Sequence, residues 1–552
     1  MLHRYALACL LPALALLAAP AHAQFGAPAA PCAVGTAEAL VQGTNVEAAV
    51  FTNGNLFYGN TRTGGNGYTA PLTASGSPSP MFAGGLWVGG LVEGEIRKAG
   101  AQFNRFEFRP GLTGADGVPP DSSACAAADV IGTLSRVSSA NEPEDFLRWP
   151  ADLGAPVVDG DGIEGNYDPR AGDQPAIRGD VMSYWAMTDT ASERQDGERP
   201  LGIDVTVEAF ADYGTALATE TFYRFTITNR NTVPIVDTYV GFWADSDLGN
   251  AADDFVGTDT TAHLAYTYNS GETDAVYGTP PAVGVSVVDG PLADENGLDD
   301  DRDGETDEPG ERLGLTSAAP ILKHGRETAG PPITPEQYYN RLRGLWNDGT
   351  EVRTYGTGYG APETYPTTVF AYPGDPITRE GWSEENPIGT DATNNAGDAR
   401  TLATTGPVTL QPGESETFTF AVVFAQGADR LNSVAQLRQT ARASRQRAVN
   451  EGFALSPLSL PALPSPPPPP ALAISRATPN PFTSTTALSF SGVGDDRLTV
   501  DVFDVLGRRV QGSVDVETDG TVEVGDGLAP GVYLVRIAGL EEAQVLAVTK
   551  VQ

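Results

Sequence analysis

The chain has 552 residues, and its formal net charge is −37 because 71 aspartates and glutamates outnumber 34 lysines and arginines. So acidic a chain repels the phosphates of nucleic acids, which argues against nucleic acid as a partner, and it suits divalent cations. The hydrophobic content of 40% is enough for a globular core. The length allows about three or four domains.

The first 23 residues have the pattern of a secretory signal peptide. His3 and Arg4 precede an apolar run from Tyr5 to Ala19, and Ala21-His22-Ala23 forms a small-x-small cleavage site. The run is too short for a membrane anchor, and no later stretch approaches the length of a transmembrane span. We therefore expect residues 1–23 to be removed during export to the periplasm.

Two cysteines, Cys32 and Cys125, remain once Cys9 leaves with that segment. In an oxidising compartment they could form a disulfide that closes a long loop, and the sequence leaves a bridge and two free thiols equally open. Only His263 and His324 remain as well, so a zinc site of the Cys and His type is poorly supported.

Residues 24–150 form a β-rich N-terminal region. The run FAGGLWVGGL at 82–91 mixes strand-forming residues with glycines, which predicts strands with tight glycine turns and close backbone approach. A phosphate-binding loop is a poor alternative, because no helix pattern follows and no lysine lies where such a loop needs one.

Residues 151–455, the central region, carry the clearest strand patterns. Apolar and polar residues alternate at 203–208 and 223–227, and bulky apolar residues recur at every second position of 418–424. The run 236–243 is apolar on both faces, as in an interior strand. These stripes predict a large antiparallel β-sandwich with long loops.

Three acidic loops within this region predict calcium binding, because alternate carboxylates can converge on one ion. The spacing at 294–311 matches the first half of an EF-hand loop, but Gly310 stands where the twelfth position needs a glutamate. That loop is therefore EF-like or thrombospondin-repeat-like at best. The loops at 157–169 and 244–259 are weaker matches, and plain solvated loops are the alternative for all three. The candidate metal ligands are Asp294, Asn296, Asp299, Asp301, Asp303, Asp307, Glu308, Asp159, Asp161, Asp168, Asp245, Asp247 and Asp253.

One helix is predicted at 429–450, because Leu431, Val434, Leu437 and Ala441 fall on one face at helical spacing. Four arginines crowd its C-terminal half, where they complement the helix dipole. They form either a solvated face of a helix packed on the sandwich, which we favour, or a basic binding patch. These are Arg438, Arg442, Arg445 and Arg447.

Residues 456–471 are predicted to be a proline-rich, extended linker. The segment 472–552 then shows short apolar strands separated by turns at Asp504–Gly507 and Pro530–Gly531. This pattern predicts a small Ig-like β-sandwich.

Several motifs in that last segment occur in a recognisable order: TPNPF at 478–482, DVLGRRV at 504–510, PGVY at 530–533 and the terminal Lys550-Val551. With them, residues 472–552 resemble the type A C-terminal sorting domain of the type IX secretion system of the Bacteroidota and their relatives. The resemblance implies recognition by the outer-membrane translocon and a sortase, and delivery to the cell surface or release outside the cell. An ordinary Ig-like binding module is the alternative.

A second resemblance covers most of 40–425 and is to a group of large exported Bacteroidota-type proteins of unknown activity. It rests on a series of motifs that occur in order. They are FAGGLWVGGL at 82–91, WPADLGAPVVDGDG at 149–162, GFWADSDLGNAADDFVGTD at 241–259, GTPPAVG at 278–284, PLADENGLDDDRDG at 291–304 and QYYNRLRGLWNDGT at 337–350.

We therefore predict a mostly β, calcium-stabilised exported protein with a binding or structural role toward a glycan or another surface ligand. The alternative is a secreted polysaccharide-acting hydrolase that uses paired carboxylates. Aromatic residues in 337–382 could stack on sugar rings in such an enzyme, although packing explains them as well. No carboxylate pair stands out and no G-x-S-x-G elbow is present, so a non-enzymatic role is favoured and no catalytic residue is assigned.

Overall fold

The computed structural model describes residues 32–551 apart from 60–66, 73–77, 104, 137–142, 193, 195–197, 214–218, 294–305, 307–309, 323–327, 390–395, 455–472, 475–476, 492–497, 505–507, 517–519 and 539–542. The predicted signal peptide and proline-rich linker lie outside these residues. The chain divides into two compact units, Met1–Leu458 and Ser459–Gln552.

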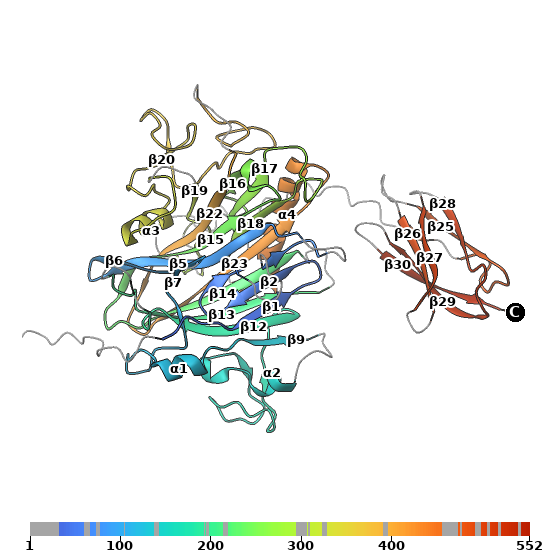
Figure 1. The fold of residues 1–552 in the computed structure, drawn as a ribbon, viewed down its shortest axis with the longest axis horizontal. Coiled ribbons are helices and arrows are strands. Elements are labelled where there is room, and N and C mark those ends of the chain that lie inside the picture. Colours follow the sequence, from blue (N-terminus) through green and yellow to red (C-terminus); the bar gives the residue numbers. More distant parts are fainter. Residues whose placement is uncertain are drawn as a thin grey trace, which may run out of the picture. The chain divides into compact units, whose positions relative to one another are not determined.

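The first unit is built on two large antiparallel sheets (Figure 1). The ten-stranded sheet has the order β1-β2-β3-β5-β15-β22-β19, with β4 and β6 paired to β5 and β7 paired to β6. Its strands are β1 (Glu38–Gln42), β2 (Glu47–Phe51), β3 (Asn55–Leu56), β4 (Tyr68–Thr69), β5 (Met81–Val92), β6 (Glu95–Gln102), β7 (Arg105–Phe106), β15 (Ile235–Ser246), β19 (Ser317–Leu322) and β22 (Ala399–Leu410).

The nine-stranded sheet has the order β16-β17-β18-β23-β14-β13-β12-β8, with β9 paired to β12. Its strands are β8 (Arg109–Pro110), β9 (Gly132–Ser135), β12 (Val181–Thr188), β13 (Ile203–Ala211), β14 (Glu220–Asn229), β16 (Asp254–Asp259), β17 (Leu264–Asn269), β18 (Ala282–Asp289) and β23 (Ser415–Ala425). Both sheets contain strands from 24–150 and from 151–455, so these two parts of the sequence form one unit.

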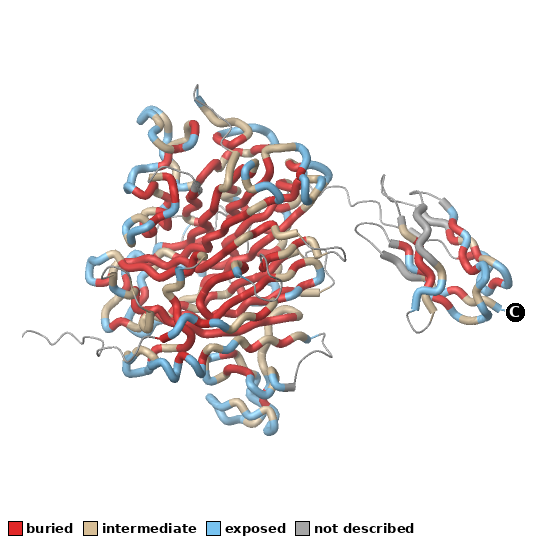
Figure 2. The backbone as a smooth tube through the Cα atoms, viewed as in Figure 1, coloured by how far each residue is buried: buried red, intermediate tan, exposed pale blue. Residues whose placement is uncertain are grey.

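The apolar stripes of the sequence meet between the two sheets, which confirms the predicted sandwich. Phe242 of β15 packs against Phe420 of β23 and Tyr223 of β14, with ring centroids 5.8 and 5.6 Å apart. Figure 2 shows the strands of both sheets as almost continuously buried. Strand β15 is interior, between β5 and β22, as its two apolar faces predicted.

The glycine-rich run 82–91 lies inside the continuous strand β5, so the tight turns predicted there are absent from it. The glycines instead allow close approach, as predicted. A Cβ on Gly85 would lie 2.2 Å from the carbonyl oxygen of Ala101, and one on Gly89 would lie 2.9 Å from Leu342 Cδ1. Bare backbone therefore makes room for a helix on this face.

That helix is α3 (Pro335–Leu342), which covers the outer face of the ten-stranded sheet. Thr334 caps it through a reciprocal capping box with Gln337. Tyr338 packs edge-on against Trp87 of β5 at 4.5 Å, and Trp87 stacks on Trp243 of β15 at 5.9 Å. These rings account for the aromatic residues on the outer side of β5 and β15.

Helix α4 (Arg430–Asn450) covers the outer face of the nine-stranded sheet, and its bounds agree with the predicted helix. Asp429 caps its N-terminus by accepting from Asn432 N at 2.8 Å. Val434, Leu437 and Ala441 are buried against β17, β18 and β23. The apolar spacing thus identified the packed face correctly.

The arginines of α4 form neither the solvated face nor the binding patch considered above. Arg438 pairs with Asp259 at 3.2 Å and Asp375 at 3.0 Å, and Arg447 pairs with Asp212 and, at 3.1 Å, with Glu220. Because the acidic partners lie on or beside the sheet, the arginines bind the helix to the sandwich.

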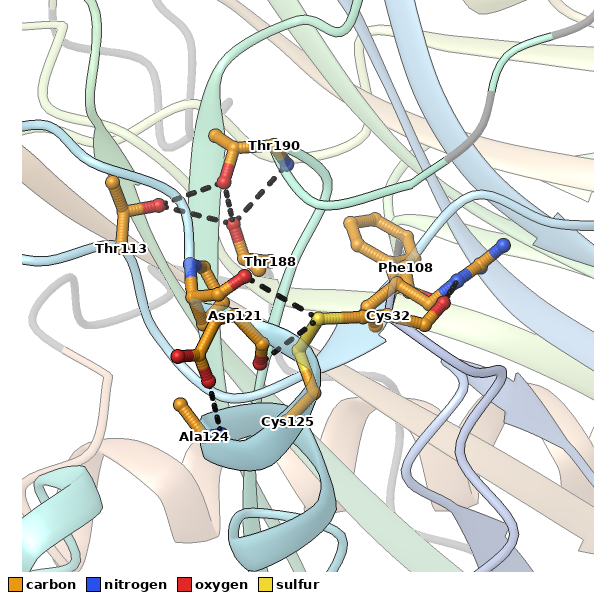
Figure 3. Close-up of a disulfide and its surroundings, with 10 residues drawn as sticks. Cys32, Phe108, Thr113, Asp121, Ala124, Cys125, Thr188 and Thr190 are labelled. Carbon is orange, nitrogen blue, oxygen red and sulfur yellow. Dashed lines mark hydrogen bonds between the residues drawn. A yellow bond between two sulfur atoms is a disulfide. The ribbon is translucent and has the colours of Figure 1, made fainter. Parts of the chain in front are cut away.

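A disulfide joins Cys32 to Cys125, with their Cα atoms 5.9 Å apart (Figure 3). Cys125 lies in the short helix α1 (Ser122–Ala127), which Asp121 caps through Ala124 N at 2.8 Å. The bridge fixes the segment before β1 to the part of the chain that follows β8. Of the two alternatives that the sequence left open, the structure has the bridge.

The remaining elements of the first unit are small. They are α2 (Pro143–Leu147), the 3-10 turns η1 (Ala151–Leu153) and η2 (Ala251–Asp253), and two ribbons, β10 (Val157–Val158) with β11 (Gln174–Pro175) and β20 (Val352–Arg353) with β21 (Thr367–Thr368). None of the helices in the described part of the chain is long and apolar enough to span a membrane.

The second unit contains two antiparallel sheets of its own around a separate core. The sheet orders are β24-β25-β28 and β27-β26-β29-β30. The strands are β24 (Ala473–Ile474), β25 (Thr486–Ser491), β26 (Leu498–Asp504), β27 (Arg509–Val516), β28 (Gly520–Val524), β29 (Gly531–Ala538) and β30 (Ala543–Lys550). Val500, Val502, Val535 and Ile537 supply core side chains, in agreement with the predicted strand pattern.

The TPNPF motif at 478–482 forms hydrogen bonds with the terminal strand β30. Asn480 Oδ1 accepts from Thr549 N at 2.8 Å, and Asn480 Nδ2 donates to the carbonyl of Ala547 at 3.1 Å. Phe482, which is 1% exposed, pairs with Lys550 in a parallel bridge and fills the core. The TPNPF motif and the terminal strand β30, which lie at opposite ends of the segment 472–552, are therefore hydrogen-bonded to each other.

Candidate metal sites in the acidic loops

The loop between β10 and β11 brings together two of its three predicted ligands. Three carboxylate oxygens, one each from Asp159, Asp161 and Asp173, lie within 4.8 Å of one another. Calcium binds oxygen at about 2.3–2.6 Å, so oxygens this close can share one ion. The third predicted ligand, Asp168, instead accepts from Arg170 N at 2.9 Å and stays outside the group.

Asp173 was missed because the predicted loop was ended at 169. It is 1% exposed and accepts from Asp168 N at 2.7 Å and Gly160 N at 2.9 Å, and these backbone donors hold the pKa of its carboxyl below the usual value. Backbone N–H groups also donate to the other two carboxylates. Gly162 N donates to Asp159 Oδ1 at 2.6 Å, and Ile163 N donates to Asp161 Oδ1 at 2.8 Å. These hydrogen bonds hold the three carboxylates in place, so the group is preformed.

A second group lies where β15 ends and β22 begins. Oxygens of Asp245, Asp247 and Asp398 lie within 4.8 Å of one another, and Arg400 Nε is 2.9 Å from Asp245 Oδ1. Burial raises the pKa of Asp245 to about 7, with Asp247 and Asp398 adding to the rise and Arg400 opposing it. Asp398 was missed because it lies directly before β22, in a segment far away in the sequence.

Asp253, predicted as a ligand with Asp245 and Asp247, lies apart from that group. It accepts from Asn269 Nδ2 at 3.1 Å. All the candidate ligands of the third predicted loop, 294–311, lie outside the described residues. Those positions are Asp294, Asn296, Asp299, Asp301, Asp303, Asp307 and Glu308.

The aromatic residues considered for sugar stacking are mostly core residues. Tyr338, Tyr339, Trp346 and Trp382 are all 5% exposed or less. Trp382 packs on Tyr372 at 4.4 Å, in a small core formed by the loops that follow α3. Their rings are thus used for packing and offer no open stacking platform.

An open apolar cavity of about 410 Å³ lies at one end of the ten-stranded sheet. Its lining carries a single carboxylate, that of Glu93, so it lacks the carboxylate pair that glycoside hydrolysis requires. The lining residues are Leu91, Glu93, Gly94, Val233, Pro234 and Val236.

Comparison with known proteins bears on the second unit. Residues 477–549 match the secretion system C-terminal sorting domain. The match lies within the segment 472–552 whose motifs resemble the type IX tail, and it identifies the chain as type IX secretion cargo. The sorting domain directs the protein to the outer surface or the extracellular space and interacts with the type IX machinery.

The rest of the chain has no such match. No curated protein sequence matches the chain. Among solved structures, a polysaccharide lyase aligns with a TM-score of 0.20 and 10% sequence identity, over 66% of this chain and 36% of the lyase. The chain thus spans about a third of the length of that lyase, and a similarity this low does not show a common fold.

Proposed function

We propose that this protein is a calcium-stabilised β-sandwich with a binding or structural role at the cell surface or outside the cell. Residues 1–23 act as the signal peptide for export to the periplasm, and the sorting domain then carries the sandwich across the outer membrane. A sortase is the expected partner for removal of the tail. The ligand class that we propose is a glycan or another surface component.

The observation that carries the calcium proposal is the convergence of Asp159, Asp161 and Asp173 within 4.8 Å. Three carboxylates of one loop repel one another unless a cation lies between them. The group of Asp245, Asp247 and Asp398 supports the same proposal at a second loop, with Arg400 offsetting part of its charge.

Calcium would stabilise the native state because only the folded loops bring these oxygens together. A ligand that binds the native state alone adds RT ln(1 + [L]/Kd) to the free energy of unfolding, about 2.7 kcal/mol at one hundred times Kd. The loop 294–311 is proposed as a further calcium-binding segment on its sequence spacing.

The test is isothermal titration of calcium into the EDTA-treated protein. The double variant Asp159→Asn/Asp161→Asn removes two ligands, and Asp152→Asn/Glu164→Gln is the matched control, since it removes the same charge from exposed neighbouring positions. We expect the first variant to bind fewer calcium ions than the wild type and the control to bind as many. Absence of calcium heat in the wild type at millimolar concentrations would refute the proposal.

A glycan panel tests the ligand class, with retention and cleavage scored separately. Retention without cleavage is the expected result. Turnover of any glycan would replace the binding role by the polysaccharide-acting alternative.

A further inference from the structure

Buried oxygen atoms without hydrogen-bond partners are concentrated between the η2 loop and the end of β17. Among the described residues, Asp254 Oδ1, Asn269 Oδ1, Asp274 Oδ2 and the hydroxyl of Tyr277 have no partner. Leaving a buried polar atom unpaired destabilises the fold, so four such atoms in neighbouring segments need an explanation.

The strand register places two of these residues side by side. Asp254, the first residue of β16, is the direct antiparallel partner of Asn269, the last residue of β17. Side chains of directly opposed residues project from the same face of a sheet, with Cβ atoms about 4.5–5.5 Å apart. Asp254 and Asn269 are 1% and 0% exposed, so neither oxygen can turn to bulk water.

The orientation of the Asn269 amide follows from its neighbours. Its Nδ2 donates to the Leu248 carbonyl at 3.1 Å and to Asp253 Oδ1 at 3.1 Å. Both partners accept only, so the nitrogen must face them and the oxygen must face the opposite way. The unpaired Oδ1 is therefore a consequence of the network.

Asp274 closes the group from the turn after β17. Its Oδ1 accepts from Val276 N and Tyr277 N, both at 2.7 Å, which leaves Oδ2 for another ligand. A Cβ on Gly249 would lie 2.1 Å from that Oδ2, so the carboxylate lies directly against the loop that leads to Asp254. Only a glycine allows this approach.

The group lacks a balancing charge from the protein. Among the described residues, no arginine, lysine or histidine forms an ion pair with Asp254 or Asp274. The charged groups that act on Asp254 are Asp253, Asp247 and Asp274, which are all acidic and repel its carboxylate. A cation at this position would remove that repulsion.

We infer that Asp254, Asn269 and Asp274 bind a structural calcium ion at a site separate from the loop between β10 and β11. Two carboxylates and an amide oxygen form a hard oxygen donor set, which favours calcium over softer metals. The ion joins the edge hairpin of β16 and β17 to the turn that follows β17. This inference rests on the proposed function, because it assumes that the exported protein meets calcium.

The other physical solution is a proton shared by Asp254 and Asp274. A proton and a calcium ion predict different behaviour of Asp254→Asn. The Asn amide still accepts from Leu248 N and can donate to an oxygen of Asn269 or Asp274, so we expect this variant to fold. It should be at least as stable as the wild type in EDTA, while losing stabilisation by calcium.

The test is calcium titration and thermal unfolding of the wild type, Asp254→Asn, Asp274→Asn and Asp159→Asn/Asp161→Asn. We expect each single variant to bind one calcium ion fewer than the wild type and to show a smaller rise of Tm with calcium. Luminescence of bound terbium, excited through tyrosine, gives a second readout, and Tyr277→Phe should reduce it because that ring adjoins the site.

The two proposals fail in different ways. If the wild type binds no calcium, both fall. If the wild type binds calcium and the Asp254→Asn and Asp274→Asn variants bind it with unchanged stoichiometry and affinity, this inference is wrong while the proposed function stands. Loss of an ion in the single variants, with Asp159→Asn/Asp161→Asn losing a different one, supports the inference.

Discussion

Replacing Arg447 by methionine should loosen α4 from the sandwich. Arg447 lies between two acidic side chains, Asp212 and Glu220, whose exposed fractions are 12% and 2%. Glu220 also accepts from the hydroxyl of Ser444 on the same helix. Methionine keeps most of the side-chain volume and removes the charge together with its hydrogen bonds, including the pair with the half-exposed Glu451 at 2.8 Å, so the variant tests the polar contribution of Arg447 without leaving a cavity.

The expected cost follows from the burial of Glu220. Removing one partner of a buried ion pair costs about 3–5 kcal/mol, because the remaining charge stays buried. Arg442→Met is the matched control on the same helix. Arg442 lies 3.6 Å from Asp259, which keeps Arg438 as a partner at 3.2 Å when Arg442 is replaced, so Arg442→Met leaves no buried carboxylate without a cation and should cost less than Arg447→Met.

The loss of stability caused by Arg447→Met should also depend on pH. Burial raises the pKa of Glu220 from 4.5 to about 7, against the hydrogen bond from Ser444 and the charge of Arg447. An acid whose folded pKa is raised stabilises the fold when protonated, and this stability is lost as the pH rises from about 4.5 to about 7. At pH 5 Glu220 is neutral in the folded state, so the cost of Arg447→Met should be smaller than at pH 8.

The assay is urea unfolding followed by tryptophan fluorescence at pH 5 and pH 8. All six tryptophans lie in the first unit, so the signal reports on the sandwich alone. Glu220→Gln combined with Arg447→Met should recover part of the loss at pH 8. Equal costs for Arg447→Met and Arg442→Met, or equal costs of Arg447→Met at the two pH values, would refute this reasoning.

Three further predictions concern other parts of the chain. Phe482→Ala removes a 1% exposed ring from the core of the sorting domain and should lower the free energy of unfolding of that unit by about 3–5 kcal/mol. Calorimetry should show the unfolding transition of the sorting domain at a lower temperature and that of the sandwich unchanged. Reduction of the Cys32–Cys125 bridge, which spans 93 positions, should cost up to about 4–5 kcal/mol, and a urea midpoint unaffected by reductant would contradict this. Glu220→Gln alone should flatten the fall in stability between pH 5 and pH 7, and an unchanged pH profile in urea would count against the raised pKa.

Much of the fold was predictable because its strands carry regular patterns. The alternation at 203–208 and 418–424, and the two apolar faces of 236–243, identified strands of both sheets and the central position of β15. The glycines at 82–91 were harder to interpret, since glycine serves both turns and crowded strands. Their role became clear only when Leu342 of α3 was placed against Gly89.

The candidate metal groups were predictable only in part. Asp159, Asp161, Asp245 and Asp247 are close in the chain, and local spacing found them. Asp398 comes from a segment that the fold brings beside Asp245 and Asp247, and no local spacing could indicate it. Arg447 of α4 illustrates the same point, because its partner Glu220 lies more than 200 positions earlier.

The central claim is that the last segment delivers the sandwich to the outside of the cell. Its most direct test is the location of the full chain and of a chain lacking 472–552, produced in a bacterium with a type IX secretion system and followed by cell fractionation. The account predicts the full chain at the surface or in the medium, and the truncated chain folded but retained in the periplasm. Surface display of the truncated chain at the normal level would contradict it.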